Sequence, residues 1–144
     1  MFAEFNYELF PIVIVNFSEN IENNDDFKDF LNKWTHLYNQ KKDFIFIFNT
    51  TNVGFPSIKY CFMMTIFIKN LRKNKYHYLK KSIIIVKNKN VMNLLDIIFY
   101  LQPPVAEVYL TKNNIEEIVN NIDNIENLDI LKKIKPGPSI LPFL

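Results

Sequence analysis

The strongest constraint on the fold is an unbroken apolar run of strand-forming residues, which a second and longer apolar segment follows. The run covers residues 44–48, and because it has no polar residue at alternate positions it predicts a strand that is covered on both faces. A polar loop at 49–55 leads to the second segment, residues 58–71, which is too long for a typical strand and predicts a helix. We therefore expect a strand–loop–helix unit built around a central strand of an α/β sheet.

The residues before this unit predict two strands and one helix. Apolar and polar residues alternate over 2–9, which is typical of a strand with one solvated face, and an apolar run at 11–17 predicts a second strand. These two strands can form a hairpin or one bent ribbon. Apolar residues at helical spacing over 26–40 predict an amphipathic helix that leads into the central strand.

The residues after the unit continue to alternate between strand and helix patterns. An apolar strand is predicted at 82–86, and a helix that Asn90 would cap is predicted to run to about residue 100. A strand at 105–110, near a sheet edge, precedes a last helix at 113–123, where Asn113 and Glu116 have the spacing of a capping box.

This order predicts an α/β fold with a single-layer, mixed and mostly parallel sheet of about 4–5 strands, covered by about four helices. Residues 1–124 are predicted to form one domain, and 125–144 an apolar, proline-containing tail that straps over the domain, inserts into a neighbour or stays disordered.

Composition limits the classes of function. The chain has 144 residues, 49% of them hydrophobic, and a net charge of +2, which is too small to indicate nucleic acid as the main partner. Its single cysteine, Cys61, excludes a disulfide within the chain, and no apolar run is long enough for a transmembrane segment. We expect a cytoplasmic protein. Asn, Ile and Lys have A/T-rich codons and indicate an AT-rich genome, so Asn-rich tracts are not read as functional signals.

No catalytic or cofactor-binding pattern stands out. His36 and His77 have no acid or cysteine at ligand spacing, and Cys61 has no nearby base. Two glycines cannot build a glycine-rich phosphate loop. The sequence therefore predicts a protein that is not an enzyme and has no metal and no cofactor.

Three stretches together resemble the STAS domain, the fold of bacterial anti-sigma-factor antagonists (SpoIIAA-like proteins), and especially its divergent branch related to CRAL-TRIO lipid-binding modules. They are FIFIFNTTNVGF at 44–55, SIIIVKNKNVMNLL at 82–95 and PPVAEVYLTKNNIEE at 103–117. The resemblance implies a non-enzymatic binding module for a protein partner or an amphiphilic ligand. Ser57 lies near the family's phosphorylatable position, but the acidic residue and the second serine of that loop are missing.

The helix predicted at 58–71 is the main candidate for an interaction surface, because apolar residues go most of the way round it. Ser57 reads as its helix cap, with a phosphate site as the alternative. A basic cluster around residues 69–81 fits either a solvated helix end or an anionic headgroup site. The residues predicted to bind a partner are Ser57, Tyr60, Met63, Met64, Phe67 and Phe143.

Two functions follow as hypotheses. The first is protein–protein interaction or self-association as a homodimer through this helix, unless the tail covers it. The second is a small CRAL-TRIO-like carrier of a lipid or other amphiphile, which requires an internal apolar cavity.

Overall fold

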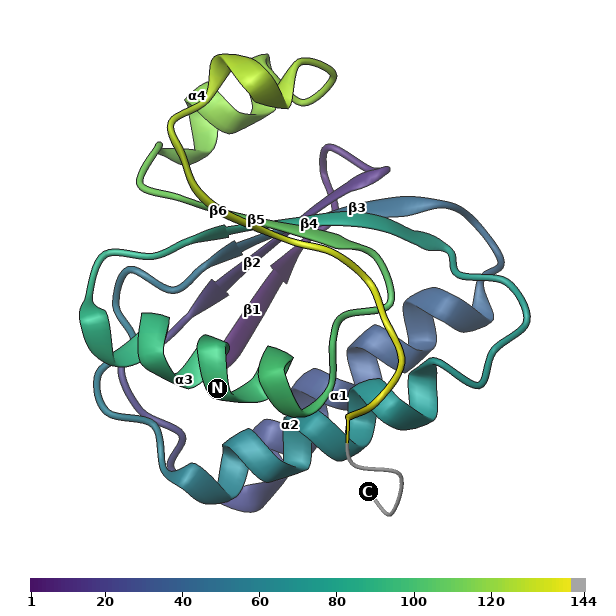
Figure 1. The fold of residues 1–144 in the computed structure, drawn as a ribbon, viewed down its shortest axis with the longest axis vertical. Coiled ribbons are helices and arrows are strands. Elements are labelled where there is room, and N and C mark those ends of the chain that lie inside the picture. Colours follow the sequence, from purple (N-terminus) through teal and green to yellow (C-terminus); the bar gives the residue numbers. More distant parts are fainter. Residues whose placement is uncertain (141–144) are drawn as a thin grey trace.

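The computed structural model describes residues 1–140, which form one six-stranded sheet with helices on both faces (Figure 1). The strands lie in the sheet in the same order as in the chain. They are β1 (Ala3–Asn6), β2 (Ile12–Phe17), β3 (Phe44–Asn49), β4 (Leu79–Ile85), β5 (Glu107–Thr111) and β6 (Ile130–Ile134). Strands β2 to β5 are parallel to one another, and the edge strands β1 and β6 are antiparallel to their neighbours.

This architecture confirms the predicted α/β class with a mixed, mostly parallel sheet. Strand β3 lies between β2 and β4, and its Phe46 and Ile47 are fully buried on opposite faces, as the unbroken apolar run predicted. Strands β1 and β2 pair as a hairpin. The sheet has one strand more than expected, because β6 arises from the segment predicted as a tail. Strand β6 forms the edge and β5 lies next to it, which agrees with the predicted place of β5 near an edge.

Three helices form a layer on one face of the sheet: α1 (Asn24–Asn39), α2 (Ile58–Leu71) and α3 (Lys89–Leu101) (Figure 1). Each connects two adjacent parallel strands, and successive right-handed crossovers in one direction place their helices on the same face. The short α4 (Ile115–Asn120) and the 3-10 turn Ile125–Asn127 connect the antiparallel pair β5 and β6 instead. They lie on the opposite face.

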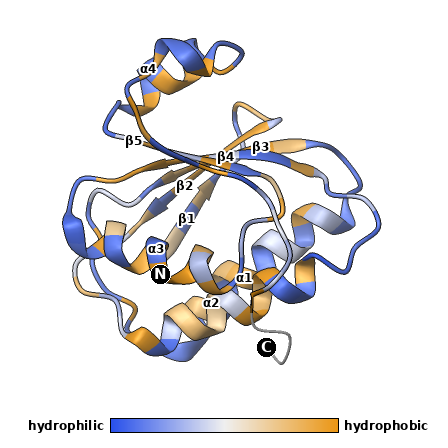
Figure 2. Ribbon diagram, viewed as in Figure 1, coloured by the Kyte–Doolittle hydropathy of each residue, from blue (hydrophilic) through white to orange (hydrophobic). Residues whose placement is uncertain are grey.

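The two faces of the sheet bury different side chains. The helix-side face is aromatic, with Phe44 and Phe46 packed against α1 residues such as Trp34, whereas the other face is built from isoleucines such as Ile47 and Ile83. Hydrophobic residues colour β3 and much of α2 in Figure 2. Alternation along the strands therefore supplies two cores, the larger of them under α1–α3.

The observed helix caps confirm one prediction and correct another. The Ser57 hydroxyl accepts a hydrogen bond from the Lys59 amide at 3.3 Å, as expected for the cap of α2. Helix α3, however, starts two residues earlier than predicted, and Asn88 rather than Asn90 caps it by accepting from the Val91 amide at 2.9 Å. Asn88 also donates to the Val53 carbonyl, so the cap position is set by contact with a distant loop.

The capping box of α4 is likewise shifted by one residue. Asn114 and Glu117 bond reciprocally to each other's backbone amides, so the predicted pair Asn113 and Glu116 was wrong. Asn113 is instead held by the buried Thr111 hydroxyl, 2.6 Å from its side-chain oxygen. Tertiary contact at the end of β5 thus decides which asparagine caps the helix.

The segment after β6 lies on its own domain as far as residue 140. The Arg72 guanidinium, just after α2, donates to the Gly137 carbonyl. The Ile140 amide donates to the Leu101 carbonyl at the end of α3, at 3.3 Å. This part of the predicted tail therefore covers the carboxyl ends of α2 and α3. Phe143 lies outside the described residues.

Candidate binding site

A cavity of about 140 Å³ lies between the helix-side face of the sheet and α1–α3. We call it the helix-side cavity. Its lining is almost wholly aromatic and aliphatic, and contains no Asp, Glu, His, Lys or Arg. Strands contribute Phe17, Phe48, Leu79, Ser82, Ile84 and Val108, and the helices contribute Phe27, Phe30, Trp34, Tyr60, Met64, Ile68, Val91, Leu94, Leu95, Ile98 and Phe99. The site is therefore an uncharged apolar hollow, partly open, within the larger of the two cores.

The hollow follows from a change in side-chain size across the sheet. Phe46 of β3 pairs with Ser82 of β4, which in turn pairs with Val108 of β5. Large rings thus fill the space between β3 and α1. Shorter side chains, including Ala106 just before β5, line the space beside β4 and β5. Short side chains leave space that the neighbouring residues fill only partly. The decrease in side-chain size from Phe46 to Ser82 and Val108 therefore accounts for the cavity.

A second hollow of about 130 Å³ adjoins the cavity, and we call it the vestibule. Its polar lining comes from Glu19, Asn20 and Ser57 in the loops that follow β2 and β3. A backbone hydrogen bond of 3.0 Å from the Gly54 amide to the Glu19 carbonyl joins these loops. The two hollows share Phe2, Ile21, Val53, Pro56 and Tyr60. The vestibule therefore lies at the carboxyl ends of parallel strands, where open α/β sheets bind ligands.

One residue that lines the cavity carries a buried polar group without a partner. Trp34 of α1 is only 5% exposed, and its indole Nε1 has no hydrogen-bond acceptor within residues 1–140. The other polar side chains behave differently: the Thr50 hydroxyl donates to the Ile85 carbonyl at 2.6 Å, and the Tyr60 hydroxyl donates to Asn24 Oδ1 at 3.2 Å. Ser82 also lines the cavity, whose exposed surface is almost wholly apolar.

The structure brings most of the predicted partner-binding residues to these two hollows. Ser57 is exposed and lines the vestibule, Tyr60 lines both hollows, and Met64 lines the cavity. Met63 and Phe67 are half-buried against the same core, and the Phe67 ring lies 5.1 Å from that of Trp34. The predicted residues thus face largely inward.

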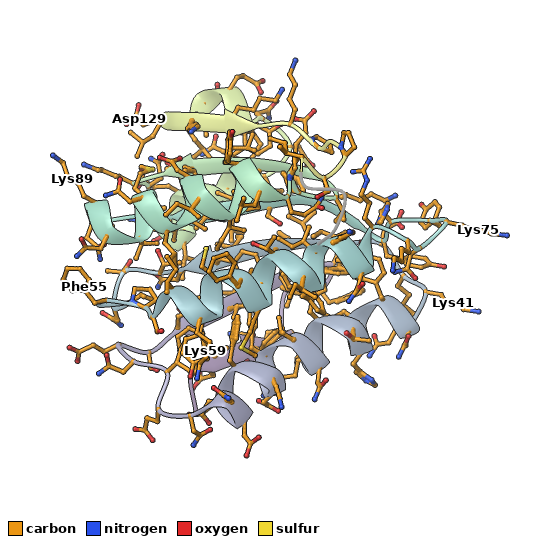
Figure 3. The ribbon with its side chains drawn as sticks, turned by 60° about the horizontal axis from the view of Figure 1, so that its bottom comes forward. Lys41, Phe55, Lys59, Lys75, Lys89 and Asp129 are labelled. Atoms are coloured by element: carbon orange, nitrogen blue, oxygen red, sulfur yellow. The ribbon has the colours of Figure 1, made fainter. Side chains whose placement is uncertain are left out.

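Other apolar residues of α2, which the prediction did not select, face outward. Ile58, Phe62 and Ile66 recur every fourth residue and are 58%, 47% and 47% exposed. We call these three residues the outer row. Helix α2 lies between α1 and α3 in the helical layer, and Phe55 and Lys59 mark the end at which it begins (Figure 3). The i, i+4 spacing was a usable signal, but an all-round apolar helix does not show which side the sheet covers.

The histidine and cysteine positions show no reactive arrangement. His77 Nδ1 lies 3.0 Å from the Tyr38 hydroxyl. Burial lowers the pKa of His77, and the positive charges of Arg72 and Lys80 lower it further, against an opposing backbone hydrogen bond at Arg72. Burial raises the pKa of the Cys61 thiol, which leaves it a weak nucleophile.

The basic cluster is partly paired within the chain. Lys80 Nζ lies 3.7 Å from an Asp43 carboxylate oxygen, donates to the Tyr76 hydroxyl at 2.8 Å and stands 4.1 Å from the centre of that ring. Arg72 is bonded to Gly137, as described above. These contacts favour the interpretation of the cluster as a solvated helix end.

Within residues 1–140, no group of three or more His, Cys, Asp or Glu side chains is placed to hold a metal ion. No helix in the same range combines the length and apolar character needed to cross a bilayer. Comparisons with protein-family models, with curated proteins and with solved structures gave no match to this chain.

Proposed function

We propose that the protein binds a small amphiphilic molecule, with the apolar part of the ligand in the helix-side cavity and a polar part in the vestibule. The observation that carries this proposal is an uncharged cavity of about 140 Å³ that adjoins a partly polar hollow. An apolar cavity of about 150 Å³ stays dry and takes up a ring-sized hydrocarbon. The size and lining of the helix-side cavity fit such a guest.

The chemistry of the two hollows suits binding. The cavity lining offers apolar surface, and each methylene moved into it from water contributes about 0.8 kcal/mol, or about fourfold in affinity. Glu19, Asn20 and Ser57 offer hydrogen-bonding groups to a polar end. The arrangement therefore places an apolar site directly beside a polar one, which suits a ligand with an apolar part and a polar part.

The proposal agrees with the CRAL-TRIO-related branch of STAS-like proteins that the sequence resembles, and it is a non-enzymatic function. We place it in the cytoplasm, which the single free and buried thiol of Cys61 supports.

Calorimetric titration with straight-chain 1-alkanols of increasing length tests the proposal. We expect saturable binding whose affinity rises about fourfold per methylene and then levels off when the cavity is full. Ala106→Leu, which places a larger side chain in the lining, should weaken binding of every alkanol. Leu131→Ala, at an exposed site on β6, is the matched control and should leave binding unchanged. An absence of saturable binding across the whole series would refute the proposal.

Self-association through the outer row is a second candidate function. Ile58, Phe62 and Ile66 form an exposed apolar row on α2, and the helix carries no acidic residue. The occupant we propose is a second copy of this chain with its α2 antiparallel. In that arrangement Ile58 of one copy meets Ile66 of the other, and the two Lys69 side chains lie at opposite ends of the contact.

Analytical ultracentrifugation tests this second candidate. Ile66→Glu should convert a dimer to a monomer, because two carboxylates would be buried in an apolar contact. Leu131→Glu is the control, since Leu131 is also 47% exposed but lies on β6. A monomeric unmodified protein at the highest soluble concentration would exclude the self-associating function.

A further inference from the structure

We propose that one end of the molecule docks on a bilayer that contains anionic lipids, through lysines in the two turns that lead into β3 and β4. We call this end the basic face and define it by Lys41, Lys42, Lys73 and Lys75. The inference goes beyond ligand binding in the helix-side cavity and does not depend on it.

The first argument is that the fold holds two distant turns side by side. One turn follows α1 and the other follows α2, and each contributes two of the four lysines. The Tyr76 hydroxyl of the second turn donates to an Asp43 carboxylate oxygen of the first at 3.1 Å. The Phe44 amide donates to the Tyr78 carbonyl at 2.9 Å. The four positive charges therefore share one surface rather than belonging to separate loops.

The second argument is that these four ammonium groups are left unpaired. Every lysine of the basic face is exposed, and none of them forms an ion pair with another residue of the described range 1–140. The one acidic residue in the two turns is Asp43, which Tyr76 and Lys80 already contact. Figure 3 shows Lys41 and Lys75 projecting outward from the same end of the molecule. The basic face therefore presents its charge to an anion outside the chain.

The third argument concerns the kind of anion. Proteins that bind single-stranded nucleic acid stack the bases on exposed aromatic rings, and nucleic-acid-binding domains are usually strongly basic. Here the net charge is only +2. Tyr76 is 50% exposed beside the lysines, but the Lys80 ammonium stands 4.1 Å from its ring centre and the Tyr78 ring packs 4.7 Å away. A tyrosine among lysines is instead typical of a surface at the level of lipid headgroups.

Docking through the basic face would orient the molecule on the bilayer. The face lies at the amino ends of β3 and β4, whereas the vestibule lies at the carboxyl ends of parallel strands. Figure 3 accordingly places Lys75 and the vestibule residue Phe55 at opposite ends of the molecule. The vestibule of a docked molecule would therefore face away from the lipid.

Co-sedimentation with vesicles tests the proposal, using phosphatidylcholine alone and phosphatidylcholine mixed with phosphatidylserine. The test variant combines Lys41→Gln, Lys42→Gln, Lys73→Gln and Lys75→Gln. The control variant changes four exposed lysines toward the opposite edge of the sheet, and combines Lys28→Gln, Lys87→Gln, Lys89→Gln and Lys112→Gln. Both variants lose the same net charge, and circular dichroism checks that both are folded.

We expect the unmodified protein to sediment with the vesicles that contain phosphatidylserine and to stay in solution with phosphatidylcholine alone. Each lysine close to an anionic bilayer contributes about fivefold to the partition coefficient, so the basic-face variant should bind at least about 50-fold more weakly. The control variant should change by less than about fivefold, because its lysines lie beyond the range of screened charge interactions. Salt at about 1 M, where the Debye length is about 3 Å, should release the unmodified protein.

Three results would overturn the proposal. The first is a failure of the unmodified protein to bind phosphatidylserine vesicles. The second is an equal loss of binding in the two variants, which would mean that net charge and not the basic face attracts the protein. The third is displacement of the protein from the vesicles by an RNA oligonucleotide that binds it more tightly, which would assign the face to nucleic acid. Alkanol binding in the helix-side cavity is measured separately and is unaffected by any of these results.

Discussion

Filling the helix-side cavity from within should stabilise the protein, whereas the same change in a filled part of the core should destabilise it. The chain has two alanines, Ala3 in β1 and Ala106 before β5, and both are buried in the helix-side core. Only Ala106 lines the cavity. Replacing each by leucine therefore adds the same atoms to a hollow site and to a packed site.

The size of the effect follows from the cavity volume. At about 24 cal/mol per Å³, a fully enclosed void of about 140 Å³ would cost about 3 kcal/mol relative to a filled core, which is an upper bound for a hollow that opens into the vestibule. Leucine adds three carbon atoms to alanine, which contribute about 2.4 kcal/mol when buried. Side-chain ordering removes about 0.5–1 kcal/mol of this. We expect Ala106→Leu to raise the free energy of unfolding by about 1–2 kcal/mol, and Ala3→Leu to lower it by about 1–3 kcal/mol through overpacking.

Urea unfolding measures both changes. The midpoint should rise for Ala106→Leu and fall for Ala3→Leu, with the slope of unfolding free energy against urea unchanged in both. Because the two variants are expected to have opposite signs, an error in either magnitude does not affect the test. Destabilisation of similar size in both would mean that the space beside Ala106 is already filled, and the proposed ligand site would lose its basis.

Three further predictions concern polar groups outside the cavity. Thr111→Val should lower the free energy of unfolding by about 1–3 kcal/mol, because the buried Thr111 hydroxyl bonds both the Asp129 carbonyl and the Asn113 amide. Urea unfolding measures this loss. The control Thr65→Val should lose less, because the Thr65 hydroxyl bonds only a carbonyl of its own helix. Asn114→Ala should cost about 1 kcal/mol in the same assay by removing the capping box of α4. The lowered pKa of His77 means that the folded state binds fewer protons than the unfolded state, so stability should fall as pH drops below about 6.5. His77→Gln should flatten this part of the stability profile, and an unchanged slope would assign it to other groups.

Local patterns were enough to predict the class of the fold. The run at 44–48 required a strand covered on both faces, and β3 is such a strand between β2 and β4. The edge strand β6 was missed because its sequence, ILKKI, places two lysines on an exposed edge and carries little of the apolar signal of a strand. Its pairing with β5 and the bonding of Asp129 to Thr111 are contacts between distant residues, which periodicity does not reveal.

The candidate site was less predictable for a related reason. The apolar character of α2 pointed to an unusual helix, but not to which side the sheet would cover, and the selected Tyr60 and Met64 turned inward. The cavity depends on the volumes of side chains from β4, β5 and three helices taken together. Whether the Trp34 indole N–H has an acceptor depends on how its neighbours are arranged in three dimensions. Neither can be read from spacing along one chain.

The cost of the cavity links ligand binding to stability. A loss of at most about 3 kcal/mol is still a large part of the 5–15 kcal/mol by which a typical domain is stable. A ligand that binds only the folded state, present at about 100 times its Kd, contributes about 2.7 kcal/mol and so offsets most of that loss. The ligand-free protein is therefore expected to unfold at lower urea than the loaded one, and the difference should shrink in Ala106→Leu, where the added side chain occupies part of the same space.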